Sequence, residues 1–590
     1  MYNPERVTYF AATDSRGKRV PFGIKTKDRS KHMYVIGKTG MGKSTLLENM
    51  AIQDIRNGEG LTFIDPHGGT ADKLLEYIPE SRGKDVVYFA PVDLARPIAF
   101  NVMEDVGYDK RHLVVSGLMA TFKKIWEDAW SARMEYILTN TLLALLEYPD
   151  ATLLGVNRMY TDKGYRKKVI ENVKDPVVKD FWTKEFANYG ERYTQEATPA
   201  IQNKIGQFTG NPLIRNIIGQ PKSSFDIREM MDTRKILIIN LSKGLVGETN
   251  MRLLGSMLTT RIFLAAMSRA EFSQEKLHSL PNFYLYVDEF QNFANETFAE
   301  ILSEARKYNL NLIIAHQYIE QMEEEVRDAV FGNVGTTVTF RVGPFDAEVL
   351  ETVFTPEFLA EDIVNLGLRQ IYLSLMIDGI GSRPFSATTI PPIEAPARTF
   401  KQEVIEASRQ QYGAQREEIE VSVREALVTE EGDEEPPAPS QRPQYGARPR
   451  PDRAPLPRAQ SGGDRARPQR TDAPPSERRS ADAPRQERSM PRADRPAPRE
   501  QQALPKEKTA EDLKAILRST IAKAEGEKGA KVVQKDKGLH DALSTVAKLP
   551  PPPPVTQAPR IVQGGNERQP DKRPFEVPED TLRSIFKEDV

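Results

Sequence analysis

The sequence predicts an α/β protein built on a mainly parallel sheet. Short apolar segments such as "MYVI" (33–36) and "LTFID" (61–65) alternate with stretches whose apolar residues recur at helical spacing. The glycine run "GKTGMGKS" (37–44) joins the first of these strands to the helix that follows it. Strands that alternate with helices in this way form parallel sheets covered by helices on both faces.

The first half of the chain divides into three predicted parts. Residues 1–30 are expected to hold a small β element, because "VTYFAA" and "RVPFGI" are extended segments separated by the turn "DSRGK". Residues 31–104 form the first part of the α/β domain and end after a third strand, "DVVYFA". Residues 105–231 contain no convincing strand, while "HLVVSGLMATFKKIW" and "ARMEYILTNTLLALLEY" are helical in spacing. We therefore expect an all-helical insertion.

Strands return in residues 232–398, the second part of the α/β domain, as "KILIINL", "NFYLYV", "LNLIIAHQ", "TTVTFRV" and "QIYLSLM". From residue 399 to 590 Pro, Arg, Gln and Glu replace apolar residues. Residues 401–439 hold 4 basic and 11 acidic residues, and residues 440–500 hold 15 Arg and 8 acidic residues. Such blocks predict a long disordered tail. Two pieces, "AEDLKAILRSTIAKA" and "EDTLRSIF", are candidate short helices.

Composition also limits where the protein works. There is no cysteine, which excludes disulfides and thiolate metal sites. The amino terminus has no apolar core of signal-peptide length, and the most apolar stretches are far shorter than the roughly 20 residues of a membrane helix. We expect a cytoplasmic protein without a membrane anchor of its own, which partners could recruit to the inner face of a membrane.

The glycine run fits the phosphate-loop pattern G-x-x-x-x-G-K-[ST] completely, between a buried strand and an amphipathic helix. Its glycines let successive backbone N–H groups surround phosphates. Lys43 is expected to reach the β- and γ-phosphates of ATP, and the Ser44 hydroxyl to ligate Mg²⁺. The predicted nucleotide-binding residues are Gly37, Lys38, Thr39, Gly40, Met41, Gly42, Lys43, Ser44 and Thr45.

Two acids follow the apolar strand "NFYLYV". Asp288 is placed to hold the Mg²⁺ ion, and Glu289 to polarise the attacking water. A single acid at this position would be an ordinary strand end that reaches solvent. An adjacent pair, in a chain that already carries a phosphate loop, favours a hydrolytic site.

Two further residues are weaker candidates. Gln317 ends the strand "LNLIIAHQ" and could sense the γ-phosphate, although alone this glutamine would be unremarkable. Arg306 lies off the apolar face of "FANETFAEILSEARKYNLN". It is either a solvated arginine that suits a helix C-terminus or an arginine finger for a neighbouring subunit. The adjacent Lys307 is the second choice.

Several segments together resemble the HerA/FtsK superfamily of DNA-pumping ATPases, and within it the TraD/TraG-like coupling proteins of type IV secretion and conjugation. The resemblance covers roughly residues 1–400. It rests on "HMYVIGKTGMGKSTLL", "FIDPHGG", "RPIAFNVM", "YVDEFQNF", "EARKYNLNLIIAHQ" and "NVGTTVTFRVG", which occur in the family's order.

The resemblance implies a RecA-like P-loop motor that forms a hexameric ring, with nucleotide at the subunit interfaces and DNA in the central channel. It also places Arg306 where the family has an arginine that reaches across the interface. The family's helical insertion is associated with substrate choice, so residues 105–231, or the tail, would bind secretion or relaxosome-type proteins.

The sequence therefore predicts an Mg²⁺-dependent ATPase that translocates DNA. The alternatives are an assembly or recruitment protein that works through its tail, and a motor with protein cargo. Lys243 and Arg252, in the loop after "KILIINL", are candidate DNA contacts, but an ordinary surface loop explains them equally well. Because the net charge of residues 1–400 is only about −4, a DNA path must be a local patch.

Overall fold

The computed structural model describes residues 3–14, 18–189 and 191–427. Within these residues one 11-stranded sheet has the order β2-β1-β13-β10-β9-β3-β8-β7-β4-β6-β5, and β11 and β12 form a separate hairpin. The strands are β1 (Val7–Thr13), β2 (Pro21–Lys25), β3 (Met33–Ile36), β4 (Gly60–Asp65), β5 (Val86–Phe89), β6 (Ile236–Asn240), β7 (Phe283–Val287), β8 (Leu310–His316), β9 (Thr336–Thr339), β10 (Gln370–Ser374), β11 (Met376–Ile377), β12 (Ile380–Gly381) and β13 (Phe385–Thr389).

The centre of the sheet is parallel from β9 to β5, as expected for strands connected through helices. β8 lies between β3 and β7, with Ile36 opposite His316 and Val287 opposite Ile314. The carboxyl ends of these three strands are therefore neighbours at one edge of the sheet. Phosphate loop, glutamine and acid pair all follow these ends.

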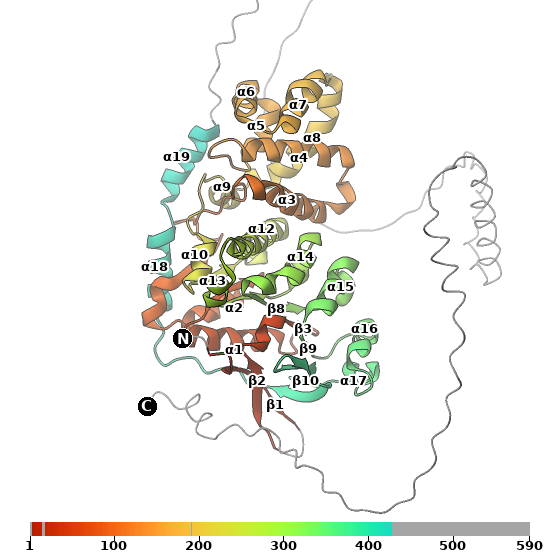
Figure 1. Cartoon of the computed structure of the whole chain (residues 1–590). Coiled ribbons are helices and arrows are strands. Elements are labelled where there is room, and N and C mark those ends of the chain that lie inside the picture. Colours follow the sequence, from red (N-terminus) through yellow and green to blue (C-terminus); the bar gives the residue numbers. More distant parts are fainter. Residues whose placement is uncertain (1–2, 15–17, 190, 428–590) are drawn as a thin grey trace, which may run out of the picture. The chain divides into compact units, whose positions relative to one another are not determined.

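Side chains of the central strands alternate between two apolar cores. Met33 and Val35 belong to the core that contains α1, whereas Tyr34 and Ile36 belong to the larger core that contains α3, α12 and α14. Because successive residues of a strand point to opposite faces, a short run that is apolar throughout indicates burial on both sides. Figure 1 shows α1 on one side of the sheet and α12 and α14 on the other.

The helices of the sheet layers follow the strands in alternation. They are α1 (Lys43–Arg56), α2 (Gly69–Leu74), α11 (Lys243–Val246), α12 (Glu248–Met267), α13 (Gln274–Ser279), α14 (Glu296–Glu304), α15 (Glu324–Asn333), α16 (Pro344–Phe354) and α17 (Ala360–Val364). Among the described helices, none combines the length and the apolar character that a bilayer crossing requires.

Between β5 and β6 the described chain forms helices and no strand. They are α3 (Arg111–Ile125), α4 (Ala132–Leu146), α5 (Gly155–Thr161), α6 (Lys163–Asn172), α7 (Pro176–Asp180), α8 (Glu191–Thr209), α9 (Pro212–Ile218) and α10 (Ile227–Asp232). We call α3 to α9 the helical lobe. Its α3 packs on α12, so closely that the Cβ of an alanine at Gly117 would lie 2.7 Å from Thr260. α4 to α8 lie beyond α3, away from the sheet (Figure 1).

The predicted small β element of residues 1–30 is part of the main sheet. β1 and β2 form an antiparallel hairpin, and β1 also pairs with β13. β13 then pairs with β10, which pairs with β9. The antiparallel strands therefore extend one side of the parallel sheet, a pairing between distant segments that local sequence patterns do not encode.

The disordered tail predicted for residues 399–590 is contradicted in its first part, up to residue 427. α18 (Lys401–Tyr412) and α19 (Arg416–Leu427) are helices packed on the rest of the chain. α18 buries Val404 beside the edge strand β5, and α19 packs Ile419 and Val423 on Leu154 of the helical lobe. Their few apolar residues recur at helical spacing, but the acidic composition of this stretch concealed them. Residues 428–590, with both candidate short helices, lie outside the described part.

Candidate nucleotide-binding site

The phosphate loop lies between β3 and α1. It runs from Gly37 to Gly42, and α1 begins at Lys43. Gly40 (φ 78°) and Gly42 (φ 118°) adopt left-handed backbone angles that residues with a side chain reach only with strain. The first N–H groups of α1 have no carbonyl partner within the helix. Loop and helix end together present the backbone donors that bind phosphate.

The loop is also open to a ligand. Gly37 and Lys43 are buried, whereas the other predicted nucleotide-binding residues are exposed or partly exposed: Lys38, Thr39, Gly40, Met41, Gly42, Ser44 and Thr45.

Lys43 is held inside the loop. Its Nζ donates to the Gly37 carbonyl oxygen at 2.6 Å and lies 3.9 Å from Glu289 Oε1. Burial lowers the pKa of Lys43, and the nearby carboxylates of Glu289 and Asp288 oppose that shift. The ammonium therefore lies at the loop and beside the acid pair.

Ser44 and Asp288 meet directly although 244 positions separate them: Ser44 Oγ donates to Asp288 Oδ2 at 2.9 Å. Asp288 is 3 % exposed. Burial, followed by the charges of Glu289 and Asp65, raises the pKa of Asp288 to about 6, while the Ser44 hydrogen bond opposes the shift. A buried carboxylate with a raised pKa favours a counter-charge such as a divalent cation.

Glu289 lies where the chain turns sharply after β7. Its φ is 48°, in the left-handed region, and its N–H donates to Asp288 Oδ1 at 3.0 Å. Gln291 Nε2 donates to Glu289 Oε2 at 2.6 Å. Strained backbone of this kind is frequent at functional sites. The turn directs the two acids differently, one to Ser44 and one towards Lys43.

Gln317 follows β8 directly, between the loop and the acid pair. It is partly exposed, and its Nε2 donates to the Tyr318 hydroxyl at 3.1 Å.

The preceding His316 is buried, with Nδ1 3.2 Å from the Tyr34 hydroxyl and no hydrogen-bond partner for Nε2 in the described residues. Burial, then Lys43 and Lys124, lowers the pKa of His316 to about 3, which keeps the ring neutral. Sequence reasoning missed this residue, although a histidine that ends an apolar strand was a visible signal.

Arg306 is not at this site. It lies in the turn Ala305–Tyr308, exposed, just before β8 begins at Leu310. Its charge contributes to lowering the pKa of His32, which directly precedes β3, although burial is the larger cause. Arg306 is therefore near the amino-terminal edge of the sheet. The nucleotide loop is at the opposite edge, about 20 Å away for a strand of seven residues at about 3.3 Å each.

The other candidate cations have partners. Lys307 pairs with Glu304 at 2.6 Å. Lys243 and Arg252, the predicted DNA contacts, both pair with Glu248, at 2.8 Å and 2.6 Å. The Glu248 carboxylate thus pairs with both of the positive charges that are predicted to contact the DNA backbone.

The residues at the strand ends fit ATP with Mg²⁺. The Ser44 hydroxyl and the Asp288 carboxylate are hard oxygen donors within 2.9 Å of each other. In the described residues no group of three or more His, Cys, Asp or Glu side chains could hold a metal by itself. Mg²⁺ is usually bound by one or two carboxylates together with substrate phosphates, so this sparse donor set is appropriate.

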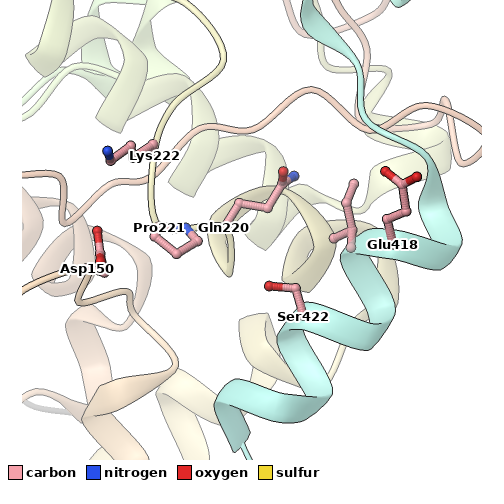
Figure 2. A pocket seen from close by; sticks show the side chains of 7 residues that line it. Asp150, Gln220, Pro221, Lys222, Glu418 and Ser422 are labelled. Carbon is pink, nitrogen blue, oxygen red and sulfur yellow. The ribbon is translucent and has the colours of Figure 1, made fainter.

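A separate pocket of about 480 Å³ lies elsewhere, between α19 and the segment after α9 (Figure 2). It is lined by Asp150, Gln220, Pro221, Lys222, Glu418, Ile419 and Ser422. None of these residues belongs to the predicted nucleotide site.

Comparison with known protein families matches residues 18–352, more than half of the chain, to the type IV secretion-system coupling protein DNA-binding domain. No curated protein matches.

Solved structures with a similar fold include two of TrwB and one of VirB4. The bacterial conjugative coupling protein TrwBdeltaN70 has 14% identity, a TM-score of 0.48, and coverage of 68% of this chain and 91% of its own. The plasmid coupling protein TrwB in complex with ADP and Mg²⁺ has 14% identity, a TM-score of 0.47, and coverage of 68% and 99%. VirB4 of Thermoanaerobacter pseudethanolicus has 13% identity, a TM-score of 0.44, and coverage of 66% and 98%.

Proposed function

The chain belongs to the type IV secretion-system coupling protein DNA-binding domain family, and on that premise we propose that it is an ATP-driven motor that translocates DNA. The observation that carries the proposal is the meeting of Ser44 with Asp288 at 2.9 Å, and of Lys43 with Glu289 at 3.9 Å. The side chains predicted to bind phosphate and those predicted to act in hydrolysis come from distant segments and meet at adjoining strand ends. A protein that only bound nucleotide would need the first set but not the second.

The reaction is hydrolysis of the bond between the β- and γ-phosphates. Lys43 and the backbone donors of the loop hold these phosphates, and Ser44 and Asp288 would hold Mg²⁺. When bound, the ion would supply positive charge against the negative charge that develops on the phosphate oxygens. Glu289 orients the attacking water and accepts its proton. Gln317 reports the presence of the γ-phosphate to the loop after β8.

The site is completed by a second copy of the chain. Arg306 lies at the edge of the sheet opposite its own phosphate loop, which supports a role at a neighbouring subunit's site. A head-to-tail interface that brings each Arg306 to the next loop generates a closed ring when the rotation between neighbours closes. We propose a hexamer with DNA in its channel, and nucleotide at each interface.

DNA binding follows from the family, and the described surface limits how it occurs. The net charge of residues 1–400 is about −4, so contacts come from local cations that grip phosphates without reading bases. Lys243 and Arg252 remain candidates, and each would have to exchange Glu248 for a phosphate. We further propose that residues 105–231 or the tail bind secretion or relaxosome-type proteins, which bring the motor to the inner face of a membrane.

The experiment is ATP hydrolysis by the full chain with and without DNA. Lys43→Ala and Glu289→Gln are expected to lower hydrolysis by about 10²-fold or more, and DNA is expected to stimulate the unmodified chain but neither of these two variants. Glu275→Gln, an exposed carboxylate of α13 outside the site, is the matched control and retains full activity. A hydrolysis rate that DNA does not change, together with binding of partners by the tail, would instead identify an assembly or recruitment protein. Stimulation by a protein substrate alone would identify a protein-secreting motor.

A further inference from the structure

One lysine of the helical lobe contacts both of the segments that follow the strand ends of the nucleotide site. Lys124 lies one residue before the end of α3, and its Nζ donates to the Ala294 carbonyl oxygen and lies 3.6 Å from Glu323 Oε1. Ala294 is five residues beyond Glu289, in the segment that leads from β7 to α14. Glu323 is six residues beyond Gln317, directly before α15. One side chain thus joins the two segments that leave the two strand ends of the site.

The segment Phe293–Asn295 is buried against α3 and α12. Asn295 Nδ2 donates to Thr121 Oγ1 of α3 at 3.5 Å, and Ser256 of α12 donates to the Phe293 carbonyl oxygen at 3.4 Å. A Cβ at Gly255 of α12 would lie 2.1 Å from the Phe293 ring. Contact this close leaves no room for the segment to move without moving α3 or α12.

Burial of the Lys124 charge costs free energy unless the charge is paired. The Lys124 side chain is 18% exposed, and burial lowers its pKa, with Glu323 as the main opposing charge. Its charge is close enough to lower the pKa of His316, together with Lys43. The helix that carries Lys124, α3, and the helix that begins at Lys43, α1, pack in the two different cores of the sheet.

We propose that Lys124 is the positioning residue that couples the helical lobe to the nucleotide site. It holds the segments that follow Glu289 and Gln317 in one arrangement. Any shift of these segments when the γ-phosphate binds or leaves is passed to α3, and any displacement of α3 is passed back to the acid pair. The inference rests on the proposed function, because it concerns regulation of that site.

The tryptophans provide a readout that does not depend on hydrolysis. All 3 tryptophans of the chain, Trp126, Trp130 and Trp182, are in the helical lobe. Trp126 is two residues from Lys124 and packs on Phe122 and Phe208 at ring distances of 5.6 Å and 5.4 Å. A change in tryptophan fluorescence on addition of Mg²⁺ and ATP therefore reports a response of the lobe.

The experiment compares variants of the full chain in a Glu289→Gln background, in which ATP binds without rapid hydrolysis. Unmodified Lys124 gives an ATP-dependent fluorescence change, and Lys124→Met abolishes it while ATP binding stays within about twofold. In the hydrolysing chain Lys124→Met lowers kcat about tenfold at unchanged KM, since the charged hydrogen bond to the Ala294 carbonyl oxygen is lost. Lys124→Arg, which keeps the charge and the donors, restores most of both.

Two further variants make the result decisive. Lys110→Met removes an ion pair directly before α3, between Lys110 and Glu271 at 2.6 Å, which involves neither of the two segments that Lys124 joins. It is expected to keep the full response. Glu323→Gln, whose side chain is 44% exposed, leaves folding intact and is expected to halve the response.

The inference is overturned if Lys124→Met or, should that variant not fold, Glu323→Gln leaves the response and kcat unchanged. It is also overturned if Lys110→Met has the same effect as Lys124→Met, because Lys124 would then be one structural contact among several. If the chain with Lys124 hydrolyses ATP in a Lys43-dependent manner but gives no ATP-dependent fluorescence change, only this inference is overturned. If the unmodified chain does not hydrolyse ATP, the proposed function is overturned.

Discussion

Replacement of Arg306 by alanine tests whether the nucleotide site is shared between subunits. Within its own subunit the arginine is about 20 Å from the phosphate loop, the length of β8. At that separation two unit charges in water interact by about 0.2 kcal/mol, before screening by salt. Such an energy changes a rate by less than about 1.5-fold. A finger inserted from a neighbour would instead contribute about 10³-fold or more to kcat.

The expected result is therefore a large loss of kcat with ATP binding retained. The assay is steady-state ATP hydrolysis, with binding measured separately at equilibrium. Lys307→Ala is the matched control, since Lys307 is the adjacent exposed cation and pairs with Glu304. It should stay within about twofold of the unmodified chain, because that surface ion pair contributes little.

Mixing two inactive variants distinguishes action of Arg306 across a subunit interface from a folding defect. Arg306→Ala has an intact phosphate loop, and Lys43→Ala has an intact arginine. In rings of an equal mixture about one quarter of the head-to-tail interfaces combine both intact residues, so hydrolysis should reappear. Normal hydrolysis by Arg306→Ala alone would refute the finger assignment. Loss of hydrolysis that mixing never restores would refute its action across an interface.

A change of pH and two substitutions have effects whose size follows from the structure. Because the pKa of Asp288 is about 6 and Mg²⁺ needs the carboxylate, a proton competes as pH falls. Between pH 7 and pH 5 the apparent Mg²⁺ affinity, corrected for protonation of ATP, should drop about tenfold; a pH-independent affinity would contradict the assignment. Gly255→Ala gains about 1 kcal/mol of helix propensity but places a Cβ 2.1 Å from the Phe293 ring. Overpacking of about 1–3 kcal/mol should therefore lower the melting temperature, and a rise would show that the ring yields freely. Asp54→Asn leaves the Arg29 guanidinium buried without its carboxylate, where side-chain exposures are now 2% and 1%. Denaturant unfolding should show a loss of about 3–5 kcal/mol, and a loss under 1 kcal/mol would mean that the pair is solvated.

The sequence predicted local features well because local chemistry determines them. A strand, a glycine run with Lys43 and a helix can be recognised from about 25 residues, since left-handed glycines and helix N-termini are short-range properties. The acid pair was equally visible at the end of an apolar strand. The match to the coupling-protein family agrees with the resemblance that these motifs suggested.

Weakly patterned segments were harder to predict. α18 and α19 have few apolar residues, and their helices are stabilised by packing on β5 and Leu154 more than by their own composition. The first strand pair was recognised as β structure, but its place in the main sheet depends on β13, which lies more than 370 residues away.

By itself, the sequence determined which residues can hold phosphate, donate to a metal or accept a proton. Only the tertiary structure decided which of them meet. The order β3-β8-β7 brings Ser44 to Asp288, leaves Arg306 at the far edge, and places Lys124 of the lobe against the segments that follow both strand ends. The physical reason is that periodicity encodes burial along one element, whereas strand order and lobe packing are set by contacts between elements that are distant in the chain.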